Sequence, residues 1–152
     1  MSESSTGPTP ETSAPRSDPL SNKSSALPLP ELEKNWRRSF WALIAVQFQG
    51  DHKKHAEILN STISKMGGSP VIAKKPGEYG FPTASLKNQA DVLRFAANLE
   101  QGAASAYLGA VPAFMSKDLA KYAASILGDE TMHWAILRNA LGENPVPAAF
   151  IS

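Results

Sequence analysis

The spacing of apolar residues is the feature of this sequence that most limits its fold. After about residue 30, apolar residues recur at steps of three, four and their sums, which is the spacing of one face of an α-helix. No run of alternating apolar and polar residues is long enough to predict a β-sheet. The chain is therefore predicted to be all-α, with three core helices. Their inward stripes are Trp41, Ile44, Phe48, Leu59 and Met66; Leu93, Ala96, Ala103, Tyr107 and Ala110; and Leu119, Ala123, Ile126, Leu137 and Leu141.

Local start and stop signals set the bounds of these helices. Pro30 can serve as a first helical residue, and the helix that it starts is expected to stop at Gly67, the first of two consecutive glycines. A second helix is predicted over roughly residues 87–110. Ser116 is expected to cap a third helix, which ends at Gly142 with prolines beyond it.

The two connections between these helices differ in length. About six residues, 111–116, join the second helix to the third, which makes these two helices antiparallel neighbours. The Pro- and Gly-rich segment 67–86 can span about 60 Å at roughly 3.3 Å per residue. A connection of that length can return along a bundle and join parallel helices. We therefore expect a partial four-helix bundle with a long crossover between its first and second helices.

The first 30 residues differ in composition from the rest of the chain. They hold eight Ser, six of the twelve Pro and no aromatic residue. Such a segment cannot bury enough apolar surface to offset the entropy lost on ordering. We predict a disordered Ser/Pro-rich tail over residues 1–29 and one helical domain over residues 30–152.

The start of the first helix imitates a targeting signal. Arg37 and Arg38 precede the apolar run Phe40 to Val46, as in a twin-arginine export leader, but no small-residue cleavage site follows. A cytoplasmic location is expected on this ground, with export to the periplasm as the alternative. The run is far shorter than the roughly 20 apolar residues that cross a membrane, so no membrane span is predicted.

Net charge and the absence of cysteine restrict the partners. The chain has 15 basic and 14 acidic residues, a net charge of +1. This balance provides no basic surface for a phosphate backbone, so nucleic acid is not an expected partner. Without cysteine there is no disulfide, thiolate nucleophile or cysteine metal ligand. Any metal must be bound by His, Asp or Glu.

Ionisable residues interrupt the apolar stripes of all three predicted helices. Glu100 lies on the inward line of the second helix, and Glu130 and His133 lie on inward lines of the third. His52 and His55 join the seam of the first helix. Burying unpaired charges costs several kcal/mol, so we expect these five residues to be compensated together by a metal ion.

The spacing and chemistry of these residues fit a divalent transition metal. Glu130 and His133 are three residues apart on one helical face, and so are His52 and His55. A mixture of imidazole and carboxylate suits iron, manganese or zinc better than calcium or magnesium. Iron is the expected cofactor, with manganese or zinc as alternatives.

The same residues also have explanations that need no metal. An isolated Glu-x-x-His pair occurs by chance in many helices. The two histidines of the first helix stand beside Lys53 and Lys54 and could belong to a solvated basic face. Glu100 could instead form a structural ion pair with Arg94 or Arg138.

Two stretches of the chain resemble the bacterial ferritin-like domain family. They are Phe95–Phe114, which contains Glu100, and Ile126–Leu137, which contains the Glu-x-x-His pair. Members of this family are often exported and are related to desiccation-associated proteins. The likeness extends over about residues 47–151. It implies a ferritin-like helical bundle with a di-iron or di-manganese site.

The resemblance also assigns the ligands residue by residue. Glu100 matches the ligand of the third ferritin helix, and Glu130 with His133 matches the pair of the fourth. His55 matches the histidine of the second ferritin helix, whereas His52 replaces its glutamate. No upstream segment resembles the first ferritin helix. Because two carboxylates neutralise one divalent ion, we expect a single metal, a degenerate site or a site completed by a second chain.

The missing helix predicts association with a partner. Three amphipathic helices leave an open groove, and Trp36, Phe40 and Trp41 add large aromatic side chains to the first helix. A homodimer that exchanges or shares first helices would close the core. We expect a ferritin-like metal-binding protein that acts in iron handling or in oxidative or desiccation stress. If it is an enzyme, we expect weak metal-dependent redox activity. The alternative is a non-catalytic helical interaction module with a degenerate metal site.

Overall fold

The computed structural model describes residues 29–151, and these residues contain helices and no strand. The three long helices are α1 (Leu29–Lys65), α2 (Gln89–Ala110) and α3 (Lys117–Ala140). Short 3-10 turns, η1 (Pro76–Glu78), η2 (Thr83–Ser85) and η3 (Val111–Ala113), lie in the connections. The all-α prediction is confirmed. The tail predicted for residues 1–29 falls, apart from Leu29, outside the described residues.

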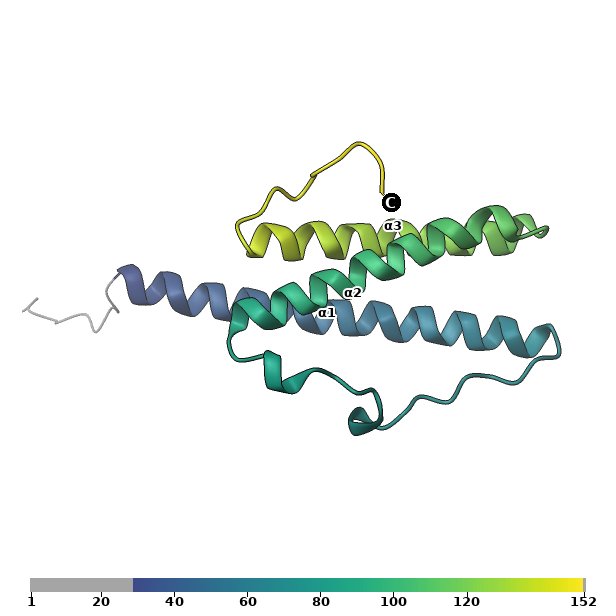
Figure 1. The fold of residues 1–152 in the computed structure, drawn as a ribbon, viewed down its shortest axis with the longest axis horizontal. Coiled ribbons are helices and arrows are strands. Elements are labelled where there is room, and N and C mark those ends of the chain that lie inside the picture. The colour runs from purple at the N-terminus through teal and green to yellow at the C-terminus, as the bar shows by residue number, and fades with distance from the viewer. Residues whose placement is uncertain (1–28, 152) are drawn as a thin grey trace, which may run out of the picture. The chain divides into compact units, whose positions relative to one another are not determined.

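The chain divides into two units, Met1–Trp41 and Ala42–Ser152. The second unit holds all of the candidate site. Within it, α2 and α3 lie side by side and run in opposite directions, whereas α1 and α2 run in the same direction (Figure 1). The connection between α1 and α2 returns along α1, so the predicted long crossover is confirmed (Figure 1).

The ends of the helices follow from local chemistry. The Asn88 side chain accepts a hydrogen bond from the Asp91 amide, and the Asp91 carboxylate accepts one in return from the Asn88 amide. The Ser116 hydroxyl accepts a hydrogen bond from the Leu119 amide and caps α3, as predicted. Gly67 and Gly142 follow α1 and α3 with φ of 82° and 73°, a conformation that favours glycine after a helix.

Two contacts fasten the crossover to the helices. The Asn60 side chain exchanges a pair of hydrogen bonds with the Val71 backbone, at 2.9 and 3.0 Å. Further along, Phe81 stacks on Tyr79 and meets the ring of Phe95 on α2 edge to face. The crossover is therefore held against α1 by Val71 and against α2 by Phe81.

The core between the helices is small. The buried apolar residues are Phe48, Ala97, Ala104, Ala123, Ile126 and Leu137. The alanines let α2 and α3 approach closely, whereas α1 reaches the other helices through the longer Phe48 side chain. None of the described helices combines the length and the apolar character needed to cross a bilayer.

Two residues of the predicted stripes were wrong. Leu59 and Met66 are exposed, because α1 meets only α2 and α3 in the second unit and so buries a narrower stripe than in a complete four-helix bundle. On α2 the most buried residues are Ala97, Glu100 and Ala104. The predicted inward residues beside them are half-buried, and Leu93 and Ala96 pack against the core.

The predicted exposed aromatic residues belong to the first unit. Phe40 is exposed, Trp41 is half-buried, and their rings meet edge to face at 5.2 Å. The side chain of Trp36 lies outside the described residues.

Candidate metal centre

Each of the three helices contributes ionisable side chains to one point in the second unit. Glu100 on α2 and both Glu130 and His133 on α3 are among the buried residues, with exposed fractions of 6%, 4% and 3%. His52 and His55 approach them from α1. The structure thus places the three predicted residues of α2 and α3 in the interior.

Four donor atoms form what we call the inner cluster: His52 Nε2, Glu100 Oε2, Glu130 Oε2 and His133 Nδ1. The His52 nitrogen lies 3.3 Å from the Glu100 oxygen and 3.2 Å from the Glu130 oxygen. The His133 nitrogen lies 3.7 and 3.8 Å from the same two oxygens. All four atoms lie within 4.8 Å of one another. Ligands about 2.1 Å from a tetrahedral metal are about 3.4 Å apart, so one ion could contact all four.

The Nδ1 atom of His133 shows that the inner cluster fits a metal. This atom is buried and has no hydrogen-bond partner among the described residues. A buried polar atom without a partner is costly, and native structures rarely keep one without a reason. An imidazole nitrogen next to two carboxylates is a ligand set that suits iron, manganese or zinc. A cation at this point would satisfy Nδ1 and the two buried carboxylates together.

The charges of the inner cluster depend on one another. Hydrogen bonds to Glu100 and then to Glu130 raise the pKa of His52 to about 10, against the effect of burial. Burial alone would raise the pKa of Glu130, but hydrogen bonds with His52 and Glu100 lower it to about 2. Burial raises the pKa of Glu100, although His52 opposes this shift. In the metal-free chain, the His52 imidazolium is therefore the cation that balances the carboxylates.

His52 combines features of the two alternatives considered for it, an inward-facing metal ligand and a residue on a solvated basic face. Its side chain is 44% exposed, yet Nε2 contacts both buried carboxylates. Lys53 and Lys54 are exposed, so the basic face lies next to the histidines without including the His52 nitrogen. The explanation of His52 as a purely solvated residue is therefore wrong.

His55 lies beside the inner cluster rather than in it. Its Nδ1 is 3.2 Å from Oε1 of Glu130, the carboxylate oxygen that is not part of the inner cluster. Its Nε2 is 3.2 Å from Oδ2 of Asp129. Four of the five predicted residues therefore share one set of donor atoms, and the fifth contacts that set from the side.

The structural ion pair considered for Glu100 is wrong. Arg94 and Arg138 both contact Glu143, each at 3.1 Å, near the end of α3. The ion-pair partners of Glu100 among the described side chains are His52 and His133. No guanidinium group competes with a metal for this carboxylate in the described part of the chain.

Sequence reasoning missed two carboxylates, Asp51 and Asp129. Their Oδ2 atoms lie 3.7 and 3.6 Å from Nε2 of His133, on the edge of the ring away from the inner cluster. We call Asp51, Asp129 and His133 Nε2 the outer cluster. A signal for both was present, because Asp51 precedes His55 by four residues and Asp129 precedes His133 by four. Residues four apart lie on the same face of a helix.

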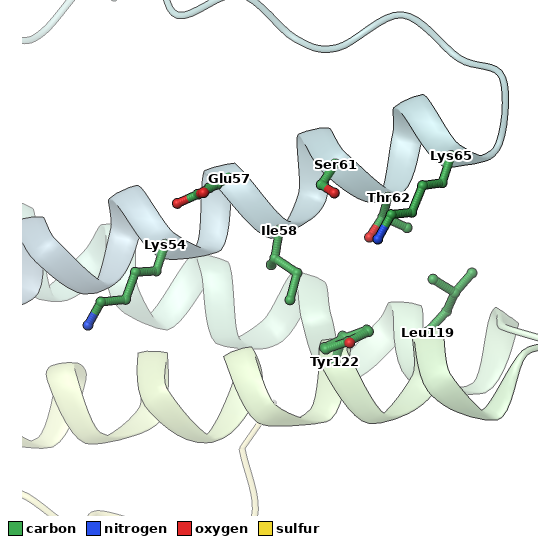
Figure 2. Close-up of a pocket in the computed structure, with 8 residues that line it drawn as sticks. All are labelled: Lys54, Glu57, Ile58, Ser61, Thr62, Lys65, Leu119 and Tyr122. Atoms are coloured by element: carbon green, nitrogen blue, oxygen red, sulfur yellow. The ribbon is translucent and has the colours of Figure 1, made fainter.

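A groove between α1 and α3 opens beside this centre. Its volume is about 550 Å³, and His55, Asp129 and Tyr122 are among its lining residues. A second groove of about 530 Å³ shares Lys54, Ile58 and Tyr122 with the first. Figure 2 shows Ile58 of α1 facing Tyr122 of α3 across it. The first groove gives His55 and Asp129 access to solvent.

Comparison with known proteins agrees with this architecture. A family model described as a ferritin-like domain matches residues 25–143. Searches of curated proteins and of solved structures return no significant match. The matched region contains α1, α2 and α3 and every residue of the two clusters. The chain therefore belongs to the ferritin-like domain family.

Proposed function

We propose that this protein binds a divalent metal ion at the inner cluster. Iron is the expected ion, and manganese and zinc are the alternatives. The observation that carries the proposal is that His52, Glu100 and Glu130 each bring a donor atom to a buried His133 nitrogen that has no hydrogen-bond partner among the described residues. The ferritin-like domain match supports it, because metal sites of such bundles are built from inward-facing side chains of facing helices.

The residues divide the work of holding the ion. Glu100 and Glu130 supply two negative charges, which match one divalent ion. His133 supplies a buried nitrogen, and His52 supplies one at the solvent side after losing its proton. His55 contacts both Glu130 and Asp129, which restrains the Glu130 carboxylate. Bound iron would supply one-electron redox chemistry.

The physiological setting that we propose is iron handling or protection against oxidative or desiccation stress. The likeness to exported, desiccation-associated bacterial proteins and the imidazole-rich ligand set support this setting. We also propose that the chain forms a homodimer. Leu43 and Val46 support a partner surface, because they lie three residues apart on α1 with exposed fractions of 69% and 67%.

Metal titration of the tag-free, metal-stripped chain tests the site. We expect tight binding of Fe(II) under anaerobic conditions, with affinity lowered at least about tenfold by Glu100→Gln and by Glu130→Gln, since each removes a negative ligand. Glu57→Gln is the matched control, because Glu57 is an exposed carboxylate on α1 outside both clusters. Circular dichroism checks that each variant folds. Failure of the wild type to bind, or equal affinity in all three variants, would contradict the proposal.

A further inference from the structure

We propose that the segment after α3 and the adjoining faces of α2 and α3 form a binding site for an uncharged apolar molecule, such as a hydrocarbon chain. The segment comprises residues 145–151, and we call it the arm. A pocket of about 490 Å³ lies between the arm and the two helices. It contains no residue of the inner or outer cluster, so this inference does not rest on the proposed metal site. The helix residues that line it are Leu108 on α2 and Leu127, Thr131, Trp134 and Ala135 on α3.

The size and lining of the pocket are those of a small-molecule site. Such sites have volumes of about 300–1,000 Å³ and are lined mainly by hydrophobic and aromatic side chains. The pocket lies within this range, and Trp134 contributes a half-buried aromatic ring to its lining. The arm adds proline, valine, alanine, phenylalanine and isoleucine side chains.

The lining also determines the charge of the ligand. Among the described residues that line the pocket, none is charged, and Thr131 alone has a polar side chain. The Thr131 hydroxyl donates a hydrogen bond to the Leu127 carbonyl at 2.7 Å, so its proton is already used. A charged group in the pocket would lose its hydration without gaining a charged partner. The pocket therefore favours an uncharged apolar ligand.

Contacts at the base of the arm hold it beside the helices. Gly142, with φ of 73°, turns the chain after α3, and the arm then runs back along that helix (Figure 1). Nε of Arg138 donates a hydrogen bond to the Asn144 carbonyl at 2.7 Å. The Asn144 side chain accepts a hydrogen bond from the Val146 amide at 3.0 Å. These contacts fix the direction in which the arm leaves α3.

Two prolines keep the arm from closing the pocket by itself. Pro145 and Pro147 each fix their own φ and favour an extended conformation in the residue before them. The arm therefore cannot fold back as a helix that packs on α3. Its apolar side chains stay in water, with exposed fractions of 72% for Val146 and 88% for Phe150. An apolar ligand in the pocket would cover part of this surface, which favours binding.

A second copy of the chain is the competing occupant of this pocket. The dimer surface proposed above is formed by Leu43 and Val46 of α1, and no residue of α1 lines the pocket. The pocket is therefore not a continuation of that surface. Its concave shape and neutral lining suit a small molecule.

The test is titration of the tag-free, metal-stripped full chain with N-phenyl-1-naphthylamine, a neutral fluorophore whose emission rises in apolar surroundings. We expect saturable binding of one probe molecule per chain, with displacement by dodecanol. Leu108→Asp should weaken binding at least about tenfold, because it places a charge in the lining. Leu99→Asp is the matched control and should change the affinity less than about threefold. Leu99 is also an exposed leucine of α2, but it does not line the pocket.

A second pair of variants changes the arm instead of a helix. Ile151→Asp should also weaken probe binding at least about tenfold, whereas Ile72→Asp, at an exposed isoleucine of the crossover, should not. Ile151 lies outside the helices, so its substitution leaves their packing intact. This pair decides the test if circular dichroism shows that Leu108→Asp does not fold.

The outcomes separate the two occupants and the two proposals. Absence of saturable probe binding to the wild type, or equal affinities in the variants and their controls, overturns the site. Sedimentation equilibrium of the same samples identifies a second copy as the occupant if Leu108→Asp and Ile151→Asp break an oligomer that binds no probe, and this result also overturns the proposal. Metal binding at the inner cluster is measured separately, so failure of this inference is distinguishable from failure of the proposed function.

Discussion

At the scale of single residues, His52 gives the centre two ways to balance its charge. In the metal-free chain the protonated imidazole contacts both buried carboxylates, and in the metal-bound chain that we propose its nitrogen becomes a ligand. The resemblance described above matches this position to a glutamate, which would add negative charge to Glu100 and Glu130. A histidine at this position therefore lets the metal-free site balance its own charges. The metal must then displace a proton from the histidine when it binds.

The pH dependence of stability should reveal this imidazolium. The pKa of His52 is about 10 in the folded chain against 6.5 for an unperturbed histidine, so its stabilising contribution is complete below about pH 6.5 and is lost as pH rises through 10. Thermal unfolding in a chelator between pH 6 and pH 10 should show this decline. His52→Gln should flatten it, whereas Lys53→Gln should not. An equally steep decline in His52→Gln would contradict the assignment.

Glu130 gives the opposite slope at acidic pH. Its pKa is about 2 in the folded chain against 4.5 when unperturbed, so its contribution is present above about pH 4.5 and is lost as pH falls toward 2. The metal-free chain should therefore lose stability in acid, and Glu130→Gln should lose less of it than the wild type. A wild-type stability that is constant between pH 5 and pH 2 would count against this pairing.

At the scale of helices, a structural feature could be predicted from the sequence when neighbouring residues in the chain cause it. The ends of α2 and α3 follow from Asn88, Ser116 and Gly142, so the sequence alone located them within about two residues. The inward positions of Glu100 and His133 followed from helical spacing. Asp51 and Asp129 share helical faces with His55 and His133, but their approach to one histidine ring depends on α1 and α3 facing each other, which spacing within one helix does not indicate.

The attachment of α1 to the other helices should depend strongly on Phe48. This residue is 9% exposed, belongs to the buried core and stacks on His133. Phe48→Ala should lower the free energy of unfolding by about 3 kcal/mol and weaken metal binding, because it leaves a cavity beside the ring. Phe114→Ala, at an exposed ring after η3, should cost less than about 1 kcal/mol. Denaturant unfolding measures both, and equal losses would contradict this role.

At the scale of the whole molecule, the second unit has three helices where a ferritin-like bundle has four. Its core is therefore small, and large apolar residues such as Leu43, Val46 and Leu99 remain exposed in the single chain. The sequence predicted this incomplete bundle, because no upstream segment carried the pattern of a first ferritin helix. A contact between two chains has no local signal in a single sequence, so the sequence did not identify Leu43 and Val46 as a partner surface.

Sedimentation equilibrium should show the homodimer that we propose. Leu43→Lys/Val46→Lys should weaken dimerisation at least about tenfold, since it puts two charges into an apolar surface. Met115→Lys is the control, because Met115 is fully exposed in the connection between α2 and α3. A monomeric wild type at all concentrations, or equal effects of both changes, would contradict the dimer surface.

The central claim is that side chains from α1, α2 and α3 converge to hold a cation at His133. Anomalous diffraction from crystals of the tag-free protein grown with Mn(II) tests it most directly. The account predicts a peak within bonding distance of His52, Glu100, Glu130 and His133. A map without any peak near His133, with the Glu100 and Glu130 carboxylates turned away from it, would contradict the account.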